Sequence, residues 1–330
     1  MKNRIYVKGI AMVFCLIGIT ALMIAGFGLA EYVMDRAENN RTSDEAFSYS
    51  EYNGKQIYYE SVRYIPNDAV ESLLILGIDK KADGTEKRQN SEQADFLAVV
   101  VMNREEESYT ILYLNRDTMT EIPETDAFGE IYGHRMGQLA LAHTYGKEEK
   151  VRCRNTVNTV ENLLYGIDID HYLSMTMDAI PILNDSVGGV TVSLMDDFTD
   201  LDETYVKDAV VTLWGEQALT YVQARGELKD NTNLHRMERQ KQYISALLDK
   251  LGSYDSEYMT DAMMKVTEYL VSDCTIDQLS KRMERMGNYT CEGTVSLEGE
   301  AVRGTDYMEY HMDEQAAQAL VVKLFYKPLE

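Results

Sequence analysis

The chain has 330 residues, of which 45% are hydrophobic and 26% are charged, so it can bury one large core or two small ones. Its formal net charge of −23 excludes a general nucleic-acid binder, because such proteins present a basic footprint to the phosphate backbone. A local basic pocket remains compatible with this charge.

The first clear pattern is the uncharged run from Gly9 to Ala30, which is long enough to span a bilayer as a helix. Basic residues precede it and acidic residues follow it (Lys2, Arg4 and Lys8; Glu31 and Asp35). The positive-inside rule predicts a single-pass cell-membrane protein with a cytoplasmic N-terminus and an extracytoplasmic remainder. The alternative is a cleaved signal peptide, whose apolar core is usually shorter, about 7–15 residues.

Three parts follow from this pattern. Residues 1–34 are interpreted as a cytoplasmic tail and transmembrane anchor, 35–70 as a stalk or linker, and 71–330 as a single extracytoplasmic domain. The stalk is polar, with one strand expected near Gln56–Tyr59. The domain contains no repeat, low-complexity tract or Pro-rich linker that would divide it further.

The domain alternates strand and helix patterns. Strands are expected over 72–79, 95–102, 109–114, 170–176, 190–194 and 293–297. Helices are expected over 136–145, 151–165, 177–187, 215–225, 232–251, 256–271 and 313–325. This alternation predicts an α/β fold with a mixed central β-sheet sandwiched by helices.

Arg116 and Asp117 directly follow the strand that ends at Leu114, before an expected chain break at Pro123. Charged side chains there are poorly placed for a core, whereas open α/β sheets bind ligands beyond the carboxyl ends of their strands. We interpret this stretch as part of a cleft that holds a pyrophosphate.

Two carboxylates, Asp79 and Asp95, end or open neighbouring buried strands. Mg²⁺ prefers oxygen ligands and is commonly held by one or two carboxylates together with substrate phosphates. The alternative is that both acids only serve as turn residues.

A second cluster contains Arg225 and, on the helix that follows Thr232, Arg236, Arg239 and Gln240. The first turns of a helix favour anions, and arginine forks match phosphate oxygens. The alternative is a solvated helix face that pairs with Glu238 and Lys241.

The four cysteines show no paired spacing typical of a zinc site (Cys15, Cys153, Cys274 and Cys291). Cys274 and Cys291 would be free to bridge outside the cytoplasm, and the sequence leaves this open.

An ordered set of segments resembles the LytR–CpsA–Psr family. They are Leu74–Asp79, Ala94–Asp95, Asn115–Thr118, Ala142–Gly146, Leu164–Tyr172, Val187–Val190, Gly215–Leu219, Tyr221–Arg225 and Arg236–Gln240. The resemblance implies Mg²⁺ as cofactor, with Asp79 and Asp95 as its ligands. It implies a catalytic role for Arg116, Asp117 and Arg225, and pyrophosphate binding by Arg116, Arg225, Arg236, Arg239 and Gln240.

The sequence departs from the family pattern at three places. Gln93 and Gln223 stand where arginine is frequent, and Gln138 and Ala140 stand where a Lys/Asn pair is expected. Lys80, Lys81 and Arg135 are candidate substitutes for the missing cationic contacts.

The resemblance implies a membrane-anchored phosphotransferase that moves a glycopolymer from a polyprenyl-pyrophosphate carrier to peptidoglycan. Its expected partners are the lipid-linked glycan, peptidoglycan and the membrane, with no nucleic acid. Two alternatives stay open: a non-catalytic polyprenyl-phosphate-binding regulator of the envelope, and a purely structural surface domain.

Overall fold

The computed structural model describes residues 48–49, 56–78, 92–224, 233–305 and 307–329, which separate into two compact units. The first unit comprises residues 1–65 with 328–330 and contains the antiparallel strands β1 (Ser48–Tyr49), β2 (Ile57–Tyr59) and β3 (Val62–Pro66), the last of which reaches the boundary. Strand β2 confirms the strand expected near Gln56–Tyr59. The predicted membrane anchor lies outside the described residues, and within these no helix is both long and apolar enough to cross a membrane.

The second unit, residues 66–327, is built on a six-stranded sheet of order β12-β9-β4-β5-β6-β13. Its strands are β4 (Val70–Ile78), β5 (Ala94–Asn103), β6 (Ser108–Leu114), β9 (His171–Thr176), β12 (Leu270–Ser272) and β13 (Thr290–Ser296). Strands β4, β5 and β6 pair antiparallel, whereas β9 is parallel to β4 and β13 is parallel to β6. The prediction of a mixed central sheet is therefore confirmed.

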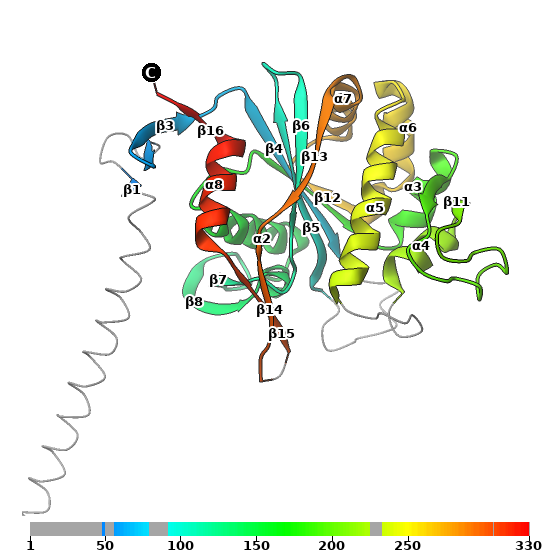
Figure 1. The fold of residues 1–330 in the computed structure, drawn as a ribbon, viewed down its shortest axis with the longest axis horizontal. Helices are drawn as coiled ribbons and strands as arrows, with labels where there is room; N and C mark the ends of the chain where they lie inside the picture. The colour runs from blue at the N-terminus through cyan, green and yellow to red at the C-terminus, as the bar shows by residue number, and fades with distance from the viewer. Residues whose placement is uncertain (1–47, 50–55, 79–91, 225–232, 306, 330) are drawn as a thin grey trace, which may run out of the picture. The chain divides into compact units, whose positions relative to one another are not determined.

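Helices cover both faces of this sheet (Figure 1). They are α2 (Glu149–Leu163), α3 (Ala179–Ser186), α4 (Glu216–Gln223), α5 (Asn233–Leu251), α6 (Ser256–Lys265), α7 (Ile276–Asn288) and α8 (Glu314–Phe325). Alternate residues of β5 enter two separate cores, because successive side chains of a strand point to opposite faces. Phe96, Ala98 and Val100 join the core beneath α3 to α7, and Leu97, Val99 and Val101 join the core beneath α2 and α8.

The remaining strands, with one exception, form ribbons. They are β7 (Met119–Thr125) with β8 (Ile131–Gln138), β10 (Val190–Ser193) with β11 (Val210–Leu213), and β14 (Gly299–Arg303) with β15 (Met308–Met312). The C-terminal strand β16 (Tyr326–Pro328) is not a ribbon strand, and its last residue belongs to the first unit. Two short 3₁₀ helices complete the described elements, η2 (Leu139–Thr144) and η3 (Thr267–Tyr269).

Three sequence predictions are wrong in this unit. Pro123 does not break the chain but lies within β7, opposite His134, because the edge of a two-stranded ribbon tolerates a residue without an N–H. The helix expected over 136–145 is the end of β8 followed by η2, since hairpin pairing overrides the local helical spacing. Similarly, the helix expected over 256–271 ends at Lys265, and the edge strand β12 takes its last residues.

Candidate functional site at the end of the sheet

The strand directions bring Asp95 and Arg116 to one end of the sheet. Strand β5 runs antiparallel to its neighbours, so its first residues lie beside the last residues of β4 and β6: Ala94 pairs with Ile78, and Leu97 pairs with Leu114. An acid that opens β5 and an arginine that follows β6 therefore meet, although they stand 21 positions apart.

Arg116 is held by two residues at the start of β5. Its Nη1 pairs with Asp95 Oδ1, and its Nη2 donates to Gln93 Oε1 at 2.5 Å. Asp95 and Gln93 are only 8% and 7% exposed, so these contacts are made with little competition from water. Gln93, at a position where the family pattern has arginine, thus supplies the acceptor that orients the Arg116 guanidinium.

Arg236, in the first turn of α5, contacts the other oxygen of the same carboxylate. Its Nη1 lies 3.4 Å from Asp95 Oδ2, and its side chain is only 5% exposed. The N-terminal end of a helix carries partial positive charge, which adds to that of the guanidinium. Two guanidinium groups from distant segments thus share one buried carboxylate.

Asp117 is positioned beside this group. Its Oδ1 lies 3.4 Å from Arg116 Nε and accepts a hydrogen bond of 2.9 Å from Gln138 Nε2, which also donates to the Met308 carbonyl at 2.8 Å. Gln138, another departure from the family pattern, therefore ties Asp117 to the β14–β15 ribbon.

Arg239 belongs to a separate cluster, three positions along α5. Its Nη1 lies 2.9 Å from Asp196 Oδ2, its Nε donates to the Tyr221 carbonyl at 3.2 Å, and its Nη2 donates to the Ala224 carbonyl. It also lies over the ring of Phe198. Arg236, Arg239 and Gln240 are 4%, 1% and 4% exposed, so the alternative of a solvated helix face is wrong for these three. The pair Lys241–Glu238, at 2.8 Å, does form on the exposed side.

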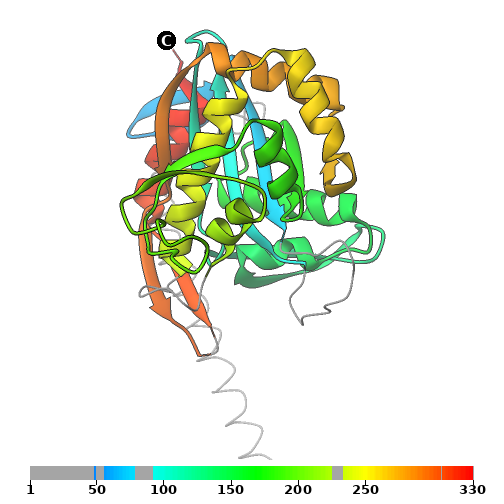
Figure 2. The ribbon, with the colours of Figure 1, turned by 90° about the vertical axis from the view of Figure 1, so that its right-hand side faces the viewer.

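Gln240 faces a narrow apolar slot between α5 and the sheet. Its Nε2 donates to the Val222 carbonyl at 3.2 Å. The slot has a volume of about 30 Å³, and its wall includes Gly77, Phe96, Met177, Ile180, Tyr243 and Ile244. Gly77 permits the close approach of the strands, because a Cβ there would lie 3.0 Å from Phe96 Cβ. The slot adjoins the charged group, since Phe96 follows Asp95 and Gln240 is one turn beyond Arg236 (Figure 2 shows α5 along this face).

A buried histidine supports the segment that carries Gln93 and Asp95. Nδ1 of His143, fully buried in η2, donates to the Glu92 carbonyl at 2.9 Å. Burial lowers the pKa of His143, and the nearby carboxylates and the bond to Glu92 only partly oppose this. Arg152, on α2, forms a salt bridge of 2.5 Å with the Glu92 side chain and so holds the same segment in place.

Asp79 and Arg225 lie outside the described residues, so the predicted site is only partly visible. Asp95 offers the hard oxygen donors that fit Mg²⁺, and its neighbour Ala94 pairs with Ile78, the residue before Asp79 in the sequence. Sequence reasoning missed Gln93, Gln138 and Asp196 as site contacts, because only the fold brings them to Arg116, Asp117 and Arg239. The two neutral glutamines had a signal nonetheless, since both replace residues of the family pattern.

The chain is similar to proteins of bacterial cell walls. It is 26% identical over 283 residues to the polyisoprenyl-teichoic acid–peptidoglycan teichoic acid transferase TagU of Halalkalibacterium halodurans, which covers 86% of this chain and 84% of that protein. It is 28% identical over 280 residues to the protein of the same name from Enterococcus faecalis, covering 83% and 82%.

The fold is shared with solved structures, among them TagV of Bacillus subtilis. That structure matches with a TM-score of 0.61 and 24% identity, over 78% of this chain and 96% of the other. The model of the LytR_cpsA_psr family matches residues 32–324, within which all the motif segments lie. The chain therefore belongs to the LytR_cpsA_psr family.

Proposed function

We propose that this protein transfers a wall glycopolymer from a polyprenyl-pyrophosphate carrier to peptidoglycan. The observation that carries the proposal is the pair of guanidinium groups, one partly buried (Arg116) and one buried (Arg236), that share Asp95 next to an apolar slot. Such a pair suits a pyrophosphate, and the apolar wall of the slot has the chemistry that the lipid of such a carrier needs. The names of the relatives in Halalkalibacterium and Enterococcus support the same substrate class.

In the proposed reaction, a hydroxyl oxygen of the acceptor attacks the phosphorus on the glycan side. A new P–O bond forms, the bond to the bridging oxygen breaks, and polyprenyl monophosphate leaves. Arg116, Arg236 and Arg225 neutralise the charge that builds on the phosphoryl oxygens, which is the main catalytic contribution in this type of transfer. Asp117 or Asp95 accepts the hydroxyl proton.

Asp79 and Asp95 would hold Mg²⁺, which when bound neutralises the negative charge of the two phosphates. Asp95 makes its described contacts with arginines, so binding of the substrate requires an exchange. The guanidinium groups leave the carboxylate for phosphate oxygens, and the carboxylate becomes available to a cation. Arginine suits this exchange because its planar fork matches both carboxylate and phosphate.

The slot under α5 is too narrow for a lipid as it stands, since about 30 Å³ accommodates roughly two water molecules. We propose that the tail enters as α5 moves away from the sheet. The cost is moderate, because the apolar surface that the helix uncovers is covered again by the tail.

We further propose that the domain lies outside the cell, attached by the uncharged segment 9–30 as a single-pass helix with its N-terminus in the cytoplasm. That location gives the site access to peptidoglycan and to a lipid carrier in the membrane.

The test uses the full chain in detergent with a lipid-pyrophosphate oligosaccharide, Mg²⁺ and peptidoglycan. Release of polyprenyl monophosphate together with covalent attachment of the oligosaccharide supports the transferase. Saturable lipid binding without release would instead favour the non-catalytic regulator. If the protein neither binds the lipid nor releases polyprenyl monophosphate, the remaining hypothesis is a purely structural surface domain.

A further inference from the structure

A second group of chemically active side chains lies at the other end of the sheet. His171 is the first residue of β9, which runs parallel to β4 with His171 opposite Leu73, far along the strand from Gly77. Asp273 and Cys274 directly follow β12. Strand β12 pairs antiparallel with β9, with Ser272 opposite Leu173, so the next residues of the chain return toward His171.

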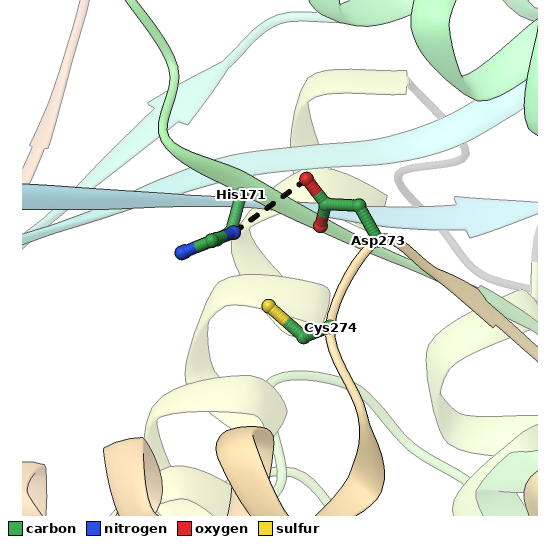
Figure 3. A group of neighbouring side chains, drawn as sticks. All are labelled: His171, Asp273 and Cys274. Atoms are coloured by element: carbon green, nitrogen blue, oxygen red, sulfur yellow. Dashed lines mark ion pairs between the residues drawn. The ribbon is translucent and has the colours of Figure 1, made fainter.

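Figure 3 shows these three side chains close together, with His171 and Asp273 joined as an ion pair. His171 Nδ1 lies 3.5 Å from Asp273 Oδ2, and one candidate ligand atom of each residue lies within 4.8 Å of the other two. The His171 Nδ1 atom is buried and makes no hydrogen bond. The Tyr172 N–H donates to Asp273 Oδ1 at 3.0 Å, which leaves Oδ2 as the atom that faces the histidine.

The donor set identifies the kind of ligand. An imidazole nitrogen, a thiol sulfur and a carboxylate oxygen are the ligands of Zn²⁺, whereas Mg²⁺ prefers oxygen alone. In a tetrahedral zinc site with the usual bond lengths, the ligand atoms stand about 3.3–3.7 Å apart. The His171–Asp273 separation of 3.5 Å already has this value, and the Cys274 sulfur lies within 4.8 Å of both partners.

We propose that His171, Asp273 and Cys274 form a Zn²⁺ site, separate from the pyrophosphate cleft and independent of the transfer reaction. A simple His–Asp ion pair would not require a thiol at the same point. Elsewhere in the described chain, His311 and Glu309 form such a pair at 3.0 Å on an exposed ribbon.

The cluster lies at the surface, since the side chains of His171 and Asp273 are 29% and 26% exposed. Cys274 lines a surface pocket of about 460 Å³ whose wall also includes Glu148 and Glu149, at the start of α2. Three protein ligands with one open position leave room for water or for a carboxylate at the fourth.

Such a site would fasten the edge of the sheet. Strand β12 is short and lies at the edge, and α7 begins immediately after Cys274 with a capping box at Thr275. A metal bound to both β9 and the β12–α7 turn would stabilise the folded state by the free energy of its binding, because the unfolded chain lacks the preformed site.

The experiment titrates the full-length protein in detergent, after removal of metals by chelation, with Zn²⁺ against a chelating dye. We expect one saturable Zn²⁺ per chain, a higher Tm with Zn²⁺, and no comparable shift with Mg²⁺. His171→Gln and Cys274→Ser should each weaken Zn²⁺ binding by on the order of 100-fold. Substitution by Co²⁺ should give a sulfur-to-metal absorption band that Cys274→Ser abolishes.

Two control variants remove similar groups elsewhere. Cys291→Ser removes an exposed thiol on β13, and His311→Gln removes the histidine of the exposed pair. Both should bind Zn²⁺ like the unchanged protein. Absence of saturable binding would overturn the proposal, as would equal affinity in the Cys274→Ser protein or a Co²⁺ complex without the sulfur band. The transfer assay does not enter this test, so a failed transferase would leave it intact.

Discussion

Arg236 and Arg239 stand three positions apart on α5, both are buried, and their surroundings differ in kind. Arg239 contacts Asp196, two backbone carbonyls and the Phe198 ring, all from segments that fold around it. Arg236 contacts Asp95, a carboxylate that Arg116 shares. The difference teaches that burial alone does not assign a role to an arginine. A guanidinium that also donates to backbone carbonyls, as Arg239 does, holds the fold together, whereas one that shares a carboxylate with a second guanidinium, as Arg236 does, can exchange it for a ligand.

The largest effect should follow removal of Arg116. Arg116→Ala should lower the transfer rate by about 10²–10³-fold, since a guanidinium directed at developing charge contributes that much. The free energy of unfolding should change by only about 1 kcal/mol, because Arg236 remains beside Asp95. Rates of polyprenyl monophosphate release and urea unfolding curves give the two values. Arg116→Lys is the control, because lysine keeps the positive charge but lacks the two-pronged guanidinium group. Transfer at the normal rate by the Arg116→Ala protein would reject the catalytic role.

Removal of Arg239 should instead damage the fold. Arg239→Met should lower the free energy of unfolding by roughly 3–5 kcal/mol, because Asp196, only 11% exposed, keeps His235 but loses its guanidinium, and the Tyr221 and Ala224 carbonyls lose their donor. Urea denaturation measures this loss. The double variant with Asp196→Asn should recover part of it, which a double-mutant cycle quantifies. A stable Arg239→Met protein with lost pyrophosphate affinity would erase the distinction between the two arginines.

A third change sharpens the comparison by adding charge to the exchangeable cluster. Gln93→Arg should raise the affinity for inorganic pyrophosphate by about tenfold and lower stability by about 1 kcal/mol, since it places a guanidinium against Arg116. Calorimetric titration gives the affinity. Gln223→Arg, at the exposed end of α4, is the matched control and should change less because solvent screens its charge.

The smallest effect concerns pH. Burial lowers the pKa of His143, so the folded protein binds a proton there less readily than the unfolded chain does. Neutral His143 therefore contributes its full share of the folding stability above the pKa of a histidine in the unfolded chain, near 6.5. This contribution is lost as the pH falls through the lower pKa of His143 in the folded protein. His143→Gln should flatten the dependence of unfolding free energy on pH below about 6.5. An unchanged slope would show that His143 does not support the Asp95 segment in this way.

Sequence patterns predicted the central strands and most helices, because continuous apolar runs such as Leu97–Val101 report burial directly. They failed where pairing decides the conformation: the residues of β8 alternate poorly, and β7 contains a proline. The residues brought together at Asp95 were also predictable, since strand ends and a helix start are local features. The contacts made by Gln93, Gln138 and Asp196 were not, because hydrogen bonds between distant segments have no local signature; the two glutamines were marked only as departures from the family pattern.

The cysteines illustrate the same limit. The sequence left open a bridge between Cys274 and Cys291, but both are free thiols, one in the turn after β12 and the other on β13. These strands occupy opposite edges of the six-stranded sheet, a fact of topology that spacing cannot reveal. The neighbour of Cys274 is instead a histidine about a hundred positions earlier in the chain.

Helix α5 carries Arg236 at its start and, within two turns, Tyr243 and Ile244 in the wall of the slot. An unbroken helix moves as one body, so a shift at Tyr243 and Ile244 also shifts Arg236. If the lipid tail displaces α5 from the strands, the Arg236 guanidinium moves with the helix. The affinity for the pyrophosphate headgroup would therefore depend on the length of the tail. Soluble pyrophosphates would then be poor mimics of the natural donor, even when their phosphates are identical.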